Sequence, residues 1–173
     1  MGKTKGIVLR PAGEIRPPLV EKLKGAIEER FATSVRVGMG FPLPEEALDP
    51  VRSQYNALLF LTKYEGQLAS SPEQETFHLL LTHVDLYCPS LNYVFGYAMP
   101  EKGIAIVSTA RFRNKLFERT IKTAVHELGH LFKLSHCNDR ECVMHFSFDL
   151  FDTDQKTDRL CRDCEKRFLK EAV

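Results

Sequence analysis

Apolar and polar residues in the first third of the chain alternate between strand-like and helix-like spacing. Residues 5–10 form a short β-type run, and Pro17-Pro18 then opens an amphipathic segment. The apolar positions of that segment recur at helical spacing, at Leu19/Val20, Leu23, Ile27 and Phe31. Residues 33–37 alternate as a second strand should, and residues 38–50, with three Pro and two Gly, predict a loop. The order strand, helix, strand predicts a βαβ unit.

Two helices and then three strands are predicted in the middle of the chain. Asp49-Pro50 indicates a helix start, and apolar residues continue at helical spacing to about Ala69. Ser71-Pro72-Glu73 indicates the start of another short helix, which would reach about Leu80. Three β-like runs follow, at residues 83–88, 92–98 and 104–109. The last two are close enough in the chain to form a hairpin.

A long amphipathic helix is predicted from about residue 115 to residue 134. Its apolar residues share one face, at Phe117, Ile121, Ala124/Val125, Leu128 and Leu131/Phe132. The opposite face is left for His126 and His130. Residues 138–159 are polar and irregular, and residues 160–171 predict a terminal helix that carries two cysteines.

The run His126-Glu127-Leu128-Gly129-His130, followed by His136, indicates a zinc centre with a general base beside it. On a helix with about 3.6 residues per turn, the first two His lie one turn apart on the same face, so both imidazoles can reach one metal. Glu127 then lies next to the metal without binding it. The same residues also fit a solvated polar stripe, an interpretation that the third His makes much weaker.

A catalytic zinc needs three protein ligands and an exchangeable water in its fourth position. His126, His130 and His136 supply three ligands only if the chain turns back near residues 133–135, because an unbroken helix would place His136 on the wrong side. Zinc lowers the pKa of bound water to about 7, and Glu127 is placed to take its proton and return it to the leaving amine. These residues predict metal-assisted peptide hydrolysis.

Composition narrows the range of functions. A chain of 173 residues with 43% hydrophobic content has enough apolar material for one domain with a core. Its net charge of +1, from 24 basic and 23 acidic residues, argues against binding to nucleic acid. No apolar run has the length of a signal peptide or of a membrane span. We therefore expect a cytoplasmic protein that binds neither nucleic acid nor membrane.

Four of the five cysteines have the spacing of a second zinc site. Cys137 and Cys142 are separated by four residues and Cys161 and Cys164 by two, and the two pairs lie about twenty residues apart, as in Cys₄ zinc sites. Two disulfides are the alternative, which a reducing cytosol disfavours. Cys88 is left over and predicts a small buried apolar residue.

Residues 126–164 resemble the archaemetzincin pattern within the metzincin metallopeptidases. The matching motif is His-Glu-Leu-Gly-His-x₅-His-Cys, then x₄-Cys-Val-Met, then Cys-Arg-Asp-Cys after sixteen residues. Residues 84–98 are also similar to that family, and a weaker likeness near residues 52–57 extends the resemblance over most of the chain.

The resemblance implies two zinc ions per chain and a particular fold. A catalytic zinc would be bound by His126, His130 and His136, with Glu127 as general base and Met144 as a hydrophobic floor, the Met-turn. A structural zinc would be bound by Cys137, Cys142, Cys161 and Cys164. The implied fold is α+β: a twisted, mixed, five-stranded sheet with an antiparallel edge strand at about residues 92–98, a backing helix, an active-site helix and a C-terminal helix. An extended peptide could add to that edge strand.

One residue departs from the metzincin pattern, which has Gly seven residues after the first His. This chain has Lys133 there, and a left-handed turn at a residue other than Gly costs about 1 kcal/mol. Either the turn is built differently or it is strained. The lysine either lies near the metal and weakens zinc affinity, or is a surface residue at a helix end, where cations are favoured.

Phe146, Phe148 and Phe151 follow the Met-turn, where metzincins build the pocket for the residue after the scissile bond. If these rings line the pocket, it is apolar. If they belong to the core, they do not define it.

Two functions remain in competition. The first is a monomeric zinc metallopeptidase that acts on peptides or proteins, as one domain with subdomains at about 1–134 and 135–173. The second is a catalytically silent zinc protein that binds peptides or partners with only the Cys₄ site occupied. Lys133 favours the second function, and Glu127 favours the first, because a structural zinc site needs no base beside its ligands.

Overall fold

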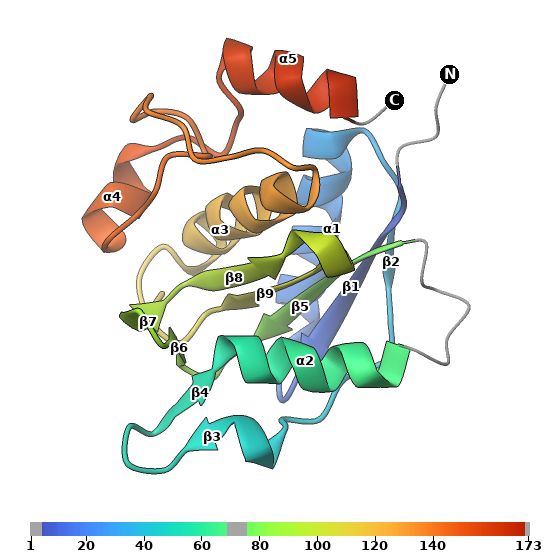
Figure 1. Ribbon diagram of the computed structural model, residues 1–173. Helices are drawn as coiled ribbons and strands as arrows, with labels where there is room; N and C mark the ends of the chain where they lie inside the picture. The colour runs from blue at the N-terminus through green and yellow to red at the C-terminus, as the bar shows by residue number, and fades with distance from the viewer. Residues whose placement is uncertain (1–4, 69–75, 172–173) are drawn as a thin grey trace.

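The centre of the molecule is a five-stranded sheet (Figure 1). In this computed structural model, which describes residues 5–68 and 76–171, four strands run parallel and the last edge strand pairs antiparallel. In sheet order the strands are β2 (Val35–Val37), β1 (Ile7–Ala12), β5 (Phe77–Thr82), β9 (Ile104–Ser108) and β8 (Gly96–Met99). The mixed sheet with an antiparallel edge strand was predicted and is confirmed.

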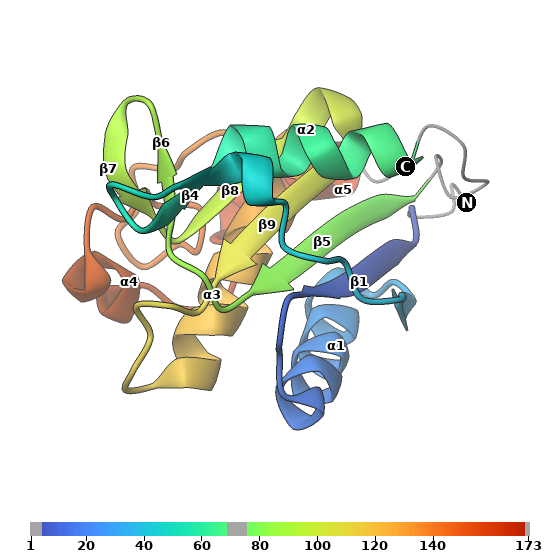
Figure 2. The same ribbon diagram turned by 90° about the horizontal axis from the view of Figure 1, so that it is seen from below.

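Helices cover both faces of this sheet, as the view from below shows (Figure 2). On one face, α1 (Pro17–Phe31) and α3 (Leu116–Leu131) pack in a core that includes Leu79 and Leu81. On the other face, α2 (Ala57–Leu68) packs in a second core with Leu80. Neighbouring residues of β5 thus point into different cores, because side chains alternate along a strand.

A smaller sheet extends the molecule beyond the start of β8. Its strands, in sheet order, are β3 (Leu48–Asp49), β4 (Gln54–Asn56), β6 (Leu86–Cys88) and β7 (Leu91–Val94). Short 3₁₀ turns at Glu45–Ala47 and Pro100–Lys102 precede β3 and β9. The predicted strand over 92–98 is therefore two strands, which belong to different sheets and are divided at Phe95. Of the strand predicted over 83–88, only residues 86–88 form a strand, β6.

The C-terminal part of the chain lies across the α1–α3 face and contains α4 (Leu150–Gln155) and α5 (Arg162–Glu171). Phe168 of α5 lies edge-on to Phe31 of α1, with ring centroids 5.5 Å apart, and to Phe132 at 4.9 Å. The terminal helix was predicted, and its start is shifted so that Cys161 precedes it. The predicted irregular stretch contains α4, whose N-cap Asp149 accepts a hydrogen bond from the Asp152 N–H.

The prediction of a helix from Asp49-Pro50 is wrong for its first turns. The Asp49 carboxylate accepts hydrogen bonds from the N–H groups of Val51 and Arg52, which makes a turn between β3 and β4. Ser53 then takes a positive φ of 54°, which ends any helix. The helix α2 begins instead after Asn56, whose side chain accepts from the Leu59 N–H at 3.1 Å. Asp49 caps a turn, and Asn56 caps the helix.

The prediction of a short helix that reaches Leu80 is also wrong over the described residues from 76 onwards. Its start, at residues 71–73, lies outside the described residues, and its end is the strand β5. All six residues of β5 are buried, with β1 on one side and β9 on the other. A central strand of this kind has no alternation of apolar and polar residues, so its sequence does not distinguish it from a buried helix.

The βαβ unit, the hairpin between β8 and β9 and the long helix α3 are confirmed. None of the helices in the described part of the chain has the length and apolar character needed to span a bilayer.

The helix α3 ends in a sharp reversal of the chain. The Lys133 N–H donates to the His130 carbonyl at 2.9 Å, and the Leu134 N–H donates to the Gly129 carbonyl at 2.9 Å. This pair of bonds forms a Schellman motif, in which the left-handed residue is usually Gly. That residue here is Lys133, with φ of 61°. The turn is therefore the usual one, held in a strained backbone conformation by a residue with a side chain.

Lys133→Gly is expected to stabilise the protein. A left-handed residue with a side chain costs about 1–2 kcal/mol, and the added freedom of Gly in the unfolded chain removes about 0.4–1 kcal/mol of that gain. A net gain of about 0.5–1 kcal/mol follows. The control is Lys133→Ala, which removes the same charge and keeps the strain. Urea unfolding of the zinc-loaded proteins measures the difference, and equal stability of the two variants would contradict the assignment of strain.

Candidate active site

The helix α3 brings His126 and His130 together because its other face is committed to the core. Ala124, Val125 and Leu128 are buried against the sheet and α1. The two histidines lie one turn apart, with ring centroids 4.7 Å apart and their Nε2 atoms 3.2 Å apart. Both imidazoles therefore direct the same nitrogen atom to one point.

Backbone carbonyls fix the orientation and the protonation of these two rings. The His126 Nδ1 donates to the Val143 carbonyl at 2.8 Å, and the His130 Nδ1 donates to the Leu134 carbonyl at 2.8 Å. A carbonyl only accepts, so each Nδ1 carries the proton and each Nε2 presents a lone pair. Burial lowers the pKa of both imidazoles, and the nearby Lys156 ammonium lowers them further. Neutral imidazoles of this kind are metal ligands.

His136 joins the pair from the segment after the chain reversal. Its ring centroid lies 5.3 Å from that of His126 and 4.9 Å from that of His130. The Cys137 N–H donates to the Met144 carbonyl at 3.0 Å, which fixes the backbone beside His136. One nitrogen from each of the three rings lies within 4.8 Å of the others.

The three histidines fit a zinc ion. Nitrogens bound at about 2.0–2.1 Å in a tetrahedral site lie about 3.3 Å apart, close to the 3.2 Å between the two helical Nε2 atoms. Two lone pairs that face each other at this distance repel unless a cation lies between them. Three nitrogen donors with one side exposed, at His136, match a zinc site with an open position.

Glu127 lies beside the histidines in a nearly closed environment. Its side chain is buried, and burial raises its pKa to about 8, while the positive charge of Lys156 acts in the opposite direction. The carboxylate fits there because its neighbour on β8 is Gly96. A Cβ on that glycine would lie 2.6 Å from both Cγ and Oε1 of Glu127.

Met144 is fully buried under the histidines. Its Sδ packs against Gly129, which lies between His126 and His130 in the helix, at a distance that leaves no room for a Cβ. The resemblance implied that Met144 forms a hydrophobic floor, and its burial agrees with this.

The four predicted cysteines form a second cluster. One sulfur atom from each of Cys137, Cys142, Cys161 and Cys164 lies within 4.8 Å of the others, and none of the five cysteines is in a disulfide. The Sγ atoms of Cys137 and Cys161 are 3.8 Å apart, which matches the separation of about 3.8 Å for thiolates bound to zinc at about 2.3 Å. The Cys161 N–H donates to the Cys142 Sγ at 3.3 Å. Cys88 is buried elsewhere, as predicted.

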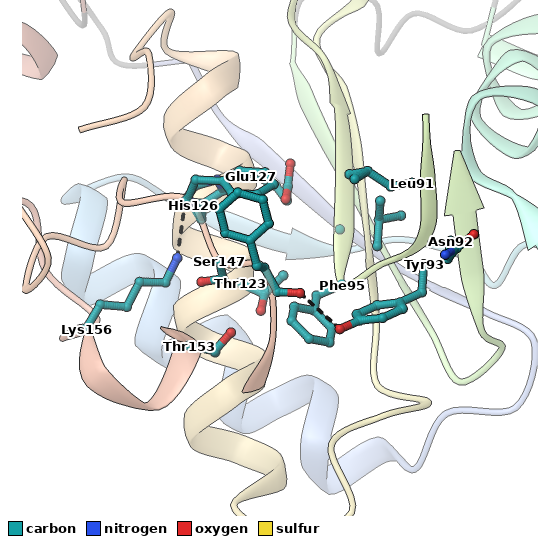
Figure 3. A pocket seen from close by; sticks show the side chains of 14 residues that line it. Leu91, Asn92, Tyr93, Phe95, Thr123, His126, Glu127, Ser147, Thr153 and Lys156 are labelled. Atoms are coloured by element: carbon teal, nitrogen blue, oxygen red, sulfur yellow. Dashed lines mark hydrogen bonds between the residues drawn. The ribbon is translucent and has the colours of Figure 1, made fainter. Parts of the chain in front are cut away.

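A cavity of about 230 Å³ opens beside His126 and Glu127 (Figure 3). It lies between β7, the start of β8 and the segment that follows Met144. Phe146 and Phe148 line it, whereas Phe151 lines a neighbouring hollow. The Tyr93 hydroxyl donates to the Phe148 carbonyl at 2.9 Å and so joins the two walls of the cavity.

The resemblance of residues 126–164 extends to known proteins. Residues 53–170 match the family model of peptidase family M54. The chain belongs to this family, the archaemetzincins. An archaemetzincin from Pyrococcus furiosus is 35% identical over 180 residues, which cover 93% of this chain and 91% of that protein. Another, from Methanopyrus kandleri, is 43% identical over 126 residues, which cover 70% of each.

Solved structures of similar proteins have the same fold. A zinc-dependent peptidase from Methanocorpusculum labreanum superposes with a TM-score of 0.88 at 29% identity, over 94% of this chain and 100% of the other. The archaemetzincin of M. kandleri superposes with a TM-score of 0.82 at 34% identity, over 97% and 96% of the two chains. Family and structure together identify the protein as a zinc metallopeptidase that acts on peptides.

Lys133 does not favour the silent alternative in this family member. Its side chain is 77% exposed, and its Nζ lies 3.5 Å from a carboxylate oxygen of Glu171 on α5. This agrees with a surface lysine at a helix end, and the strain of the turn is confined to the backbone.

Two residues of the site were missed by sequence reasoning. Lys156 lies in the stretch predicted to be polar and irregular, where a lysine indicates a solvated surface, yet it is buried beside His126. Gly96 lies inside a predicted strand. A glycine in a strand interior often marks the close approach of another group, a signal that could have found Gly96. No comparable signal exists for Lys156.

Gly96→Ala is expected to lower peptide cleavage on the order of 100-fold while zinc content stays unchanged, because the new Cβ displaces the Glu127 carboxylate. Gly66→Ala, on α2, is the matched control because a Cβ there meets nothing within 4 Å. Turnover of a fluorogenic peptide mixture and zinc analysis of both variants give the comparison. Full activity in Gly96→Ala would mean that this contact does not position the carboxylate.

Proposed function

We propose that the chain hydrolyses peptide bonds at a zinc ion held by His126, His130 and His136, with Glu127 as general base. The observation that carries the proposal is the convergence of three imidazole nitrogens within 4.8 Å beside one buried carboxylate. A buried carboxylate without a catalytic role would be a costly feature of a metal site, because burial disfavours its charged form.

Each group in the site has a separate role in the proposed reaction. Zinc, when bound there, supplies an acidified water and polarises the carbonyl of the scissile bond. Glu127 takes the proton from that water and returns it to the leaving amine, and its raised pKa suits both steps. The carbonyls of Val143 and Leu134 hold the histidine rings in the tautomer that binds metal.

The edge strand β8 offers a place for the substrate backbone. It pairs with β9 on one side only, and Gly96 at its start touches Glu127. An extended peptide added along the free side would run past the proposed base, as in β-strand addition. This geometry favours cleavage of unfolded peptides or loops over cleavage within helices.

A second zinc, held by Cys137, Cys142, Cys161 and Cys164, would be structural. The cluster joins the segment after the reversal to the start of α5, and the Val143 N–H, which donates to the Arg159 carbonyl at 2.9 Å, connects the same two parts of the chain. Four sulfur ligands leave no position for water, so this site would hold the chain and take no part in hydrolysis. Two zinc ions per chain follow from the two clusters.

We further propose that the enzyme is a single domain, a cytoplasmic protein and a monomer. Residues Cys142, Met144 and Phe168 share one core with α1 and α3, which supports a single domain with subdomains at about 1–134 and 135–173. A site of four free thiols suits a reducing compartment, and we place the protein in the cytoplasm. The near-neutral charge argues against binding to nucleic acid, and we propose that the protein acts on peptides as a monomer.

Glu127→Gln is expected to abolish peptide cleavage, by a factor of about 10² to 10⁴, and to keep two zinc ions per chain. The amide has the same shape and cannot accept the proton. Glu118→Gln, at an exposed glutamate on α3 that precedes Glu127 by about two and a half turns, is the matched control and should be fully active. Single-turnover cleavage and metal analysis test both variants. Unchanged turnover in Glu127→Gln would refute the proposed mechanism.

Cys161→Ser is expected to lose one zinc ion per chain and to lower the melting temperature, because structural zinc contributes folding free energy. Cys88→Ser is the control: its cysteine is buried outside the cluster, so zinc content should not change. Calorimetric melting and metal analysis of both proteins decide the matter. If Cys161→Ser kept the parent's zinc content and melting temperature, the Cys₄ site would be wrong.

A further inference from the structure

One lysine ammonium is buried beside the cavity and has no ion-pair partner in the described part of the chain. Lys156 follows α4 and is only 4% exposed. Its Nζ donates to the His145 carbonyl at 2.8 Å and lies 3.5 Å from the His126 Nδ1. That Nδ1 donates its own hydrogen to the Val143 carbonyl, so it does not accept from the lysine. Among the described residues, the His145 carbonyl is thus the one hydrogen-bond acceptor found for the three ammonium hydrogens.

The charges around Lys156 are committed elsewhere. No carboxylate in the described part of the chain lies within ion-pair distance of its Nζ. Asp152 accepts from the Phe148 N–H, and Asp154 binds Arg119 through two hydrogen bonds of 2.9 and 2.8 Å. Glu127 lines the same cavity and is the proposed base. Burial of an ammonium group that has no ion-pair partner costs free energy, and a bound anion would offset that cost.

Other polar groups of the cavity lie near this end of it. The Ser147 Oγ is buried and has no hydrogen-bond partner in the part of the chain that the structure describes. Thr123 and Thr153 donate their hydroxyl hydrogens to the backbone, which leaves their oxygens as acceptors only. Figure 3 shows Lys156, Ser147 and Thr153 on one side of the cavity and Phe95 on the other.

The rest of the cavity is suited to a carbon chain. Val94, Phe95, Phe146 and Phe148 contribute apolar walls. The volume of about 230 Å³ is below the usual range for drug-sized ligands, which begins at about 300 Å³, and suits one amino-acid side chain. An aliphatic stem with an anionic end matches this combination of apolar walls and a cationic end.

We propose that Lys156, with the Ser147 hydroxyl, makes this cavity a subsite for a carboxylate next to the scissile bond. The preferred substrates carry Glu or Asp there, or end there in a free carboxylate. The ammonium lies on the Nδ1 side of His126, whereas the nitrogen that faces the metal site is Nε2, so the carboxylate binds apart from the metal. The inference rests on the proposed peptidase function and names the substrate class of that site.

Peptide pairs that differ only in Glu against Gln test the subsite. The pair is compared at the position before and at the position after the scissile bond, on the zinc-loaded full chain. A charge-assisted hydrogen bond to the ammonium contributes about 1.5–3 kcal/mol, so kcat/KM at one of the two positions should favour Glu by about tenfold or more. A third pair, with the chain ending after that residue as a free acid or as an amide, shows whether a terminal carboxylate is accepted as well.

Lys156→Met removes the ammonium and keeps the length of the side chain. The Glu preference should fall to near unity, while zinc content stays at the parent's value. Lys122→Met is the matched control: Lys122 donates to the carbonyls of Thr153 and Asp154 and does not line the cavity, so the preference should persist. Melting temperatures of both variants identify any loss of folding, and Ser147→Ala, which should weaken the preference in part, keeps the test available if Lys156→Met fails to fold.

Two results would overturn the proposal. The first is a parent enzyme that cleaves Gln and Glu peptides equally. The second is a Glu preference that survives in Lys156→Met, including the case in which cleavage of both peptides falls by the same factor because the lysine acts through Glu127.

Binding distinguishes a failure of the subsite from a failure of the peptidase function. If the parent cleaves no peptide, calorimetric titration with glutamate amide and glutamine amide measures the subsite directly. Tighter binding of glutamate amide by about tenfold, lost in Lys156→Met, would support a carboxylate site in a protein that is not a peptidase. Equal binding of the two amides would refute the subsite.

Discussion

The active site depends on one sharp reversal of the chain at the end of α3. The reversal brings the Leu134 carbonyl back over the helix, where it accepts from the His130 Nδ1. It also sends the chain towards His136, which an unbroken helix would carry to the far side. A single strained residue, Lys133, provides the turn. Backbone conformation at a position that touches no ligand thus decides whether three nitrogens meet.

Packing around the reversal explains how the strain is tolerated. Phe132, just before it, lies in an aromatic group with Phe31, Phe77 and Phe168, whose ring centroids lie 4.9 to 5.3 Å from its own. These rings belong to α1, β5 and α5, so three elements oppose any unwinding of the turn. Burial of four large rings contributes several kcal/mol, well above the cost of one left-handed residue. The core around the helix end therefore holds a backbone conformation that the local sequence disfavours.

Sequence patterns predicted the features that depend on neighbours in the chain. The spacing of His126 and His130 predicted a shared face of α3, and the βαβ unit followed from local periodicity. Patterns failed where distant contacts decide. The strand β5 is buried because α1 and α3 cover one face and α2 covers the other, and Asp49 caps a turn where β3 pairs with β4. Lys156 is buried by α3 and by the segment around His145, and the spacing of residues near Lys156 in the sequence does not predict these contacts.

The adjacency of His136 and Cys137 has a thermodynamic consequence. One residue belongs to the histidine cluster and the next to the cysteine cluster, and a single peptide bond joins them. Metal at either cluster restricts the same short piece of backbone, and so reduces the conformational entropy that the other must remove. If metal at the cysteines raises the metal affinity of the histidines by some factor, metal at the histidines raises the metal affinity of the cysteines by the same factor. If metal binds at both clusters, as proposed, the two are coupled sites, and filling one of them raises the affinity of the other.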